Sequence, residues 1–78
     1  MREKKKYRIL TFRTTTDAMT MEKACRQNGI PGRMSPVPRE ISASCGLAWR
    51  IDAEDFPLYE EKIRELYVEY ENSIELML

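Results

Sequence analysis

The sequence predicts a small α+β fold, a two-layer sandwich of the ferredoxin-like type with the order β-α-β-β-α and a possible final strand. Three observations lead to this prediction. Two segments have the apolar spacing of amphipathic helices, short strand-like runs precede both of them, and 78 residues allow only one domain, 1–78. With both helices on one face of the sheet, both crossover connections can be right-handed.

The first strand is expected from Tyr7 to Phe12, a short run of good strand-forming side chains. Basic residues cluster around its start: Arg2, Lys4, Lys5, Lys6 and Arg8. We expect residues 1–6 to form a flexible, solubilising basic tail rather than an arm that binds phosphate.

The first helix is expected from about Asp17 to Asn28, because the polar stretch at residues 14–17 suits a helix N-cap. Its apolar stripe consists of Ala18, Met21 and Cys25. Gly29 is suited to the left-handed position that follows a helix C-terminus.

Two strands are expected in the middle of the chain. Residues 33–37 lie among three prolines, which exclude a central strand but allow an edge strand. In residues 47–51, Leu47, Trp49 and Ile51 alternate with Ala48 and Arg50, which is typical of a half-buried strand. We expect Trp49 to belong to the core, with a docking aromatic as the alternative if the other face of the sheet is open.

The second helix is predicted by an apolar stripe, and Pro57 fits its first turn. The stripe consists of Phe56, Tyr59, Ile63, Leu66 and Tyr70, and Tyr67 widens it. The apolar tail, residues 73–78, could add a short final strand.

Composition excludes several classes of function. The 13 basic residues balance 13 acidic ones, so the chain lacks the basic surplus of a nucleic-acid-binding protein. The chain has no His, which excludes a His-based triad, and its two Cys are too few for a usual zinc site. No apolar run is long enough for a membrane span or a signal peptide. We therefore expect a cytoplasmic protein with free thiols and without a cofactor.

The connection over residues 36–48 is long for so small a domain, and such connections are often functional. It contains Cys45 between two small residues, Ser44 and Gly46. Gly46 would let the backbone approach a ligand or adopt a positive φ. Backbone N–H groups of the loop, or nearby Arg39, would favour a reactive thiolate. Ser42 and Ser44 could cap a turn or donate hydrogen bonds to a persulfide.

The sequence resembles the selenium/sulfur carrier protein-like family of small bacterial proteins. The matching stretches are residues 11–12, 15–18, 22–23, 29–31 and, most specifically, PVPREISASCGLA at 36–48. The resemblance implies a compact α+β domain with one functional cysteine, here Cys45. It also implies that Cys45 carries sulfur or selenium, as Cys–S–SH or Cys–S–SeH, between donor and acceptor proteins. Such a protein is a carrier or co-substrate more than an enzyme with its own turnover.

Several alternatives stay open at this point. Cys45 could be a structural, half-buried residue, and Arg39 could form a surface ion pair with Glu40. The chain could instead be a non-catalytic interaction module that uses a bare sheet face, and it could form a homodimer through that face. Cys25 is expected in the core, where a disulfide with Cys45 would require Cα atoms within about 7 Å. Arg33 and Arg50 could flank the Cys45 site.

Overall fold

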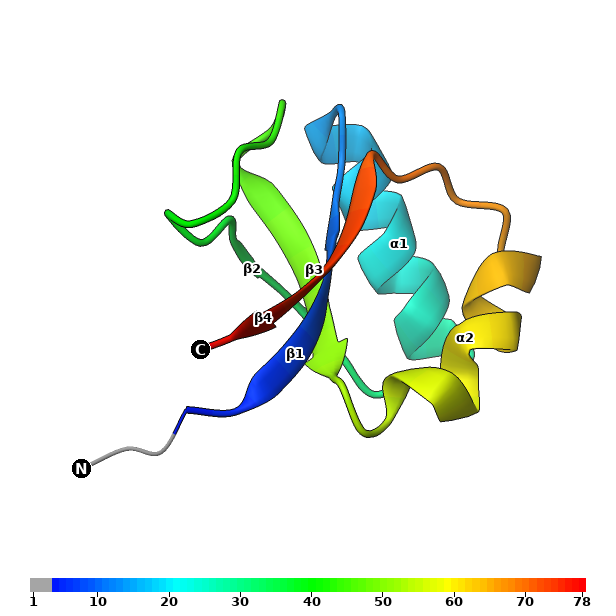
Figure 1. The fold of residues 1–78 in the computed structure, drawn as a ribbon. Helices are drawn as coiled ribbons and strands as arrows, with labels where there is room; N and C mark the ends of the chain where they lie inside the picture. The colour runs from blue at the N-terminus through cyan, green and yellow to red at the C-terminus, as the bar shows by residue number, and fades with distance from the viewer. Residues whose placement is uncertain (1–3) are drawn as a thin grey trace.

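The computed structural model describes residues 4–78 and confirms the predicted fold class (Figure 1). A four-stranded antiparallel sheet has the strand order β2-β3-β1-β4, and both helices lie on one side of it, as in ferredoxin-like folds. The elements are β1 (Lys6–Thr11), α1 (Thr15–Gln27), β2 (Arg33–Pro36), β3 (Leu47–Asp52), α2 (Phe56–Glu65) and β4 (Asn72–Met77). Within these residues neither helix combines the length and apolar character needed to cross a membrane.

Trp49 is the largest fully buried side chain and lies between the sheet and the helices. The strand register places it opposite Leu10 on β1 and Met34 on β2. Its indole also lies directly against Gly32, where an added Cβ would come within 2.2 Å of Trp49 Cζ2. The predicted core position of Trp49 is confirmed, and it makes glycine necessary at position 32.

Helix α1 begins at Thr15, two residues before the predicted start. The side chain of Thr14 caps it by accepting a hydrogen bond from Asp17 N at 3.1 Å. Gly29, with φ of 68°, follows the C-cap and adopts the predicted left-handed conformation.

Helix α2 is shorter than its apolar stripe predicts, since it ends at Glu65. Tyr67 adopts a left-handed conformation with φ of 54° and is 89% exposed, so it does not widen the buried stripe. Its N–H donates to Arg64 O at 3.3 Å, which places it in the left-handed position after the helix. Tyr70 is also exposed, and the chain turns there toward β4.

The expectation of a flexible basic tail is wrong for Lys5 and Lys6, the residues nearest the sheet. Lys6 is the first residue of β1, and Lys5 exchanges two backbone hydrogen bonds with Leu78, at 2.8 and 2.9 Å. Lys5 Nζ lies 2.7 Å from Asp52 Oδ2, and this carboxylate raises the pKa of Lys5. Residues 1–3 of the predicted tail lie outside the described residues.

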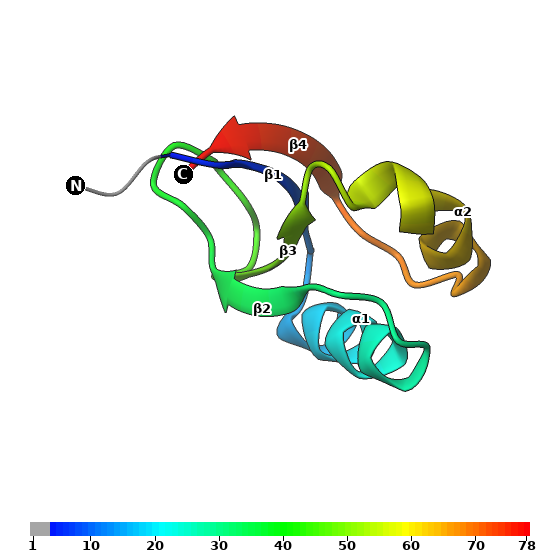
Figure 2. The ribbon, with the colours of Figure 1, turned by 90° about the horizontal axis from the view of Figure 1, so that it is seen from below.

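The sheet face opposite the helices is not bare, contrary to expectation. Ile9, Thr11 and Ala48 point to this face by register and alternation, yet each is 0% exposed. The connection between β2 and β3, residues 37–46, lies on the same side of the sheet (Figures 1 and 2). We call this face the loop face and this connection the central loop.

Candidate functional site

The ends of the central loop are held together, so the segment is a compact Ω-loop. Val37 N donates to Gly46 O at 3.0 Å, which closes the loop where β2 and β3 begin to pair. Inside it, Ile41 N donates to Pro38 O at 3.0 Å and forms a tight turn. The loop therefore presents the Ser-Cys-Gly sequence from a backbone that is fixed at both ends.

Cys45 is half-buried at the point where the loop returns to the sheet. Its N–H donates to Phe12 O at 3.2 Å, which ties it to the end of β1, three residues before α1 begins. Its Sγ accepts a hydrogen bond from Leu47 N at 3.3 Å and lies 3.4 Å from Leu47 O. The sulfur thus packs against the edge of the core while a backbone N–H points at it.

Glu71, just before β4, anchors the residue that precedes the cysteine. Its carboxylate accepts hydrogen bonds from Ser44 N at 3.2 Å and from Ser44 Oγ. These two bonds lower the pKa of Glu71, first through the Ser44 side chain and then through its backbone, and nearby Arg13 lowers it further. Glu71 N in turn donates to Thr11 O, so the anchor is built on the end of β1.

Arg13 extends the site on the side of α1. It follows Phe12, whose carbonyl binds Cys45, and its side chain is exposed. With Tyr70 it lines a hollow of about 440 Å³ between the start of α1 and the segment before β4. Asp17 and Glu69 also line the hollow, so one cation, two acidic residues and an aromatic ring lie at the same end of the sheet as the cysteine.

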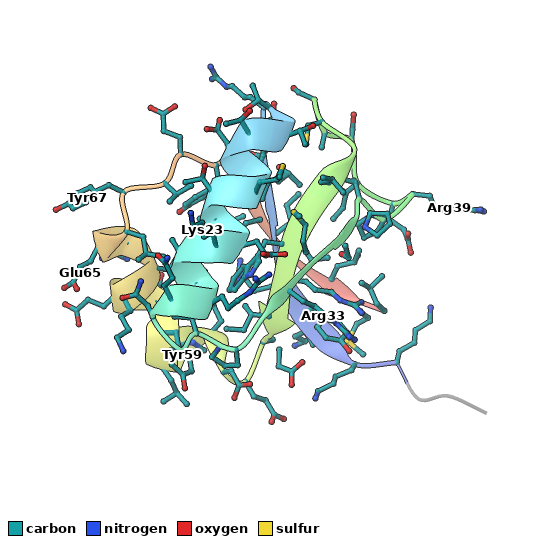
Figure 3. All side chains as sticks on the ribbon, turned by 180° about the vertical axis from the view of Figure 1, so that it is seen from behind. Lys23, Arg33, Arg39, Tyr59, Glu65 and Tyr67 are labelled. Atoms are coloured by element: carbon teal, nitrogen blue, oxygen red, sulfur yellow. The ribbon has the colours of Figure 1, made fainter. Side chains whose placement is uncertain are left out.

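The predicted binding residues do not converge on the sulfur. Ser44 Oγ is engaged by Glu71, and Ser42 is exposed beside the same carboxylate in a hollow of about 300 Å³. Arg39 projects from the central loop away from the body of the protein (Figure 3). Gly46 does not have a positive φ, and a Cβ there would meet no atom within 4 Å. Gly46 thus leaves open space next to Cys45, whereas Arg39 lies where a partner could contact it.

The two cysteines differ sharply in their surroundings. Cys25 is 2% exposed in the core, as predicted, and burial raises its pKa to about 11. Both cysteines are free thiols in the described structure. Cys25 is therefore an inert packing residue, and Cys45 is the thiol with access to solvent.

Arg33 and Arg50 do not flank the cysteine. Arg33 on β2 pairs with Arg50 on β3. Arg50 is three residues beyond Leu47 along β3, a distance of about 10 Å. They lie toward the opposite end of the sheet from the Ser-Cys-Gly sequence.

Sequence reasoning missed Glu71 and Arg13, because neither belongs to a local motif. The signal that could have found them is topological. In this strand order the end of β1 and the starts of β3 and β4 meet at one end of the sheet. Residues just after β1 and just before β4 must therefore lie beside a cysteine that precedes β3.

Comparisons with known proteins identify one family. A family model described as "Putative Se/S carrier protein-like" matches residues 6–75, which include all six secondary-structure elements in whole or in large part. No curated protein and no solved structure matches the chain significantly. Since the match covers most of its length, the chain belongs to the Se/S carrier protein-like family.

Proposed function

We propose that the protein carries a sulfur or selenium atom on Cys45 and passes it between partner proteins. The observation that carries the proposal is that a member of this family has one accessible thiol, Cys45, held on a closed loop. Cys25, the other thiol, is buried and has a raised pKa. A carrier needs one reactive thiol rather than a full catalytic constellation, and a single half-buried free thiol supports this role for Cys45.

The loading step is a thiol–persulfide exchange. The Cys45 thiolate attacks the outer sulfur of a donor persulfide, so that a new S–S bond forms as the donor's S–S bond breaks. The bonding electrons leave with the donor thiolate, and there is no net oxidation. In the unloading step an acceptor thiolate attacks the outer sulfur of Cys45–S–SH, and the Cys45 thiolate leaves. A selenium atom would move in the same way as Cys45–S–SeH.

The surroundings of Cys45 suit both steps. Leu47 N can continue to donate to Sγ when the thiol proton is lost, while the contact of the thiol with Leu47 O is then no longer a hydrogen bond. Cys45 is half-buried rather than enclosed, which is compatible with the addition of one atom to its sulfur. The hollow lined by Arg13 and Tyr70 gives a partner's segment a place to bind at the same end of the sheet.

The alternative function, an interaction module that uses a bare sheet face, has lost its main support. Ile9 and Ala48 are fully buried on that face, and the central loop lies on the same side. An interaction with partners remains part of the carrier proposal, through the end of the molecule that holds Cys45.

The proposal is tested by intact mass after the reduced protein is incubated with a sulfane-sulfur donor. We expect wild type and Cys25→Ala to gain one sulfur atom and Cys45→Ser to gain none. A gain that persists in Cys45→Ser, or no gain in wild type, would contradict the proposal. Cys25→Ala is the matched control because it removes the other thiol and leaves the loop intact.

A further inference from the structure

A second charged feature lies on the loop face, away from Cys45. Arg33 on β2 is directly opposite Arg50 on β3, so both side chains share this face. The Cβ atoms of such a pair are about 4.5–5.5 Å apart, and like charges in these positions repel. Figure 3 shows Arg33 on the side of β2 away from α1. We call these two residues the arginine pair.

The arginine pair borders a hollow of about 220 Å³, formed together with Tyr7, Pro31, Gly32 and Asp55. Tyr7 positions one member, because the guanidinium carbon of Arg50 lies 4.8 Å from the centre of its ring. A guanidinium held over an aromatic ring still presents its N–H groups outward in the plane of the fork.

Two acidic groups at the hollow balance the formal charge of the arginine pair, but neither forms an ion pair with it. Asp52 also lines it, but Lys5 Nζ lies 2.7 Å from that carboxylate. Asp55 is the remaining acidic group at its rim. Among residues 4–78 neither member of the arginine pair forms an ion pair within 4.0 Å, so no carboxylate occupies the N–H groups of either guanidinium.

We propose that the arginine pair binds a tetrahedral oxyanion of the phosphate class. Each guanidinium presents a planar fork of donors, and two forks need an anion with more than two acceptor oxygens. A carboxylate satisfies one fork, whereas a phosphate group has enough oxygens for both. The anion would also remove the repulsion between the two arginines. This inference does not rest on the chemistry of Cys45, because the two places are at different ends of the sheet.

The test is a titration with sodium phosphate at constant ionic strength, followed by the NMR signals of the arginine Nε–H groups. Emission of Trp49, the single tryptophan, gives a second readout. Its indole lies against Gly32, and Gly32 lines the hollow. We expect saturable shifts at Arg33 and Arg50. Arg33→Gln and Arg50→Gln should each raise Kd by about tenfold or more, as expected for loss of hydrogen bonds to a charged group.

Arg39→Gln is the matched control, because it removes the same charge from an arginine that projects away from the protein. Arg33→Lys keeps the charge but removes the fork, so it should also weaken binding, and it covers the case in which a Gln variant does not fold. Equal weakening in Arg39→Gln and Arg33→Gln would show a general charge effect and overturn the proposal. Shifts that do not saturate would overturn it as well.

Two further titrants identify the source of the anion. Phenyl phosphate that binds at least as tightly as inorganic phosphate would show that the hollow accepts a phosphate ester, and weaker binding would indicate the free ion. Acetate at the same ionic strength should bind clearly more weakly than either. If acetate binds as well as phosphate, the geometric argument for a tetrahedral anion is wrong.

Discussion

Gly32→Ala tests the packing of the core most sharply. The added Cβ would lie 2.2, 2.7 and 2.8 Å from three ring atoms of Trp49. Ordinary carbon–carbon contacts are about 3.5–4.0 Å, so the indole has to retreat by more than about 1 Å. Trp49 is 0% exposed, and the surrounding core leaves it little freedom to move. Overpacking of this kind costs about 1–3 kcal/mol, and we expect a net loss of about 2 kcal/mol in the free energy of unfolding.

The other two glycines of the chain provide matched controls. At Gly46 a Cβ meets nothing within 4 Å and φ is not positive, so Gly46→Ala should change stability by less than about 1 kcal/mol, toward higher stability. At Gly29 the space is also open, but φ is 68°. Gly29→Ala should therefore cost about 1–2 kcal/mol through backbone strain alone.

The assay is urea unfolding followed by far-UV circular dichroism, with Trp49 emission as a second probe. In a separate thermal unfolding experiment, a loss of about 2 kcal/mol would lower the Tm of a domain of this size by about 8–16 °C. Emission of Trp49 should also change in folded Gly32→Ala and not in folded Gly46→Ala. If the two variants agreed in stability within about 0.5 kcal/mol, the argument that Trp49 requires glycine at position 32 would be refuted.

Three further predictions concern single residues. Tyr67→Gly should raise the free energy of unfolding by about 1 kcal/mol, because Tyr67 is exposed and its positive φ suits glycine; an unchanged urea midpoint would contradict this. At pH 8, iodoacetamide should alkylate Cys45 in the folded protein. It should alkylate Cys25, which is buried and has a pKa of about 11, only in denaturant. Mass spectrometry of the peptides shows which cysteine is labelled, and labelling of Cys25 in the folded protein would contradict the prediction. Glu71→Gln should destabilise the protein at neutral pH. The bonds from Ser44 lower the pKa of Glu71 below 4.5. The stability advantage of wild type over Glu71→Gln should therefore disappear as the pH falls from about 4.5 through this lowered pKa. A difference in urea midpoints that does not change with pH would contradict the prediction.

Most of the fold could be predicted from the sequence because local signals agreed with the final topology. Alternation at Leu47, Trp49 and Ile51 placed a half-buried strand, and Gly29 marked the end of the first helix. The end of the second helix could not be predicted in this way. Tyr67 occupies a left-handed position that glycine usually holds, and the apolar stripe continues past it in the sequence alone.

The sequence predicts the Ser-Cys-Gly loop as the candidate site, but it does not indicate the residues that hold this loop in place. Cys45 could be singled out because its neighbours are local in sequence. Glu71 binds Ser44 across 27 residues of chain, and no local pattern contains that contact. Likewise the loop face could not be recognised as covered, because the burial of Ile9 depends on where a connection without secondary structure lies.

The measurement that tests the carrier proposal most directly is unloading. Wild-type protein that has gained one sulfur atom on Cys45 is separated from the donor and mixed with a thiol acceptor, and the intact masses of both are followed over time. The proposal predicts that the protein returns to its original mass while the acceptor gains the sulfur in equal amount. A sulfur atom that stays on Cys45, or leaves without appearing on the acceptor, would contradict a role as a carrier.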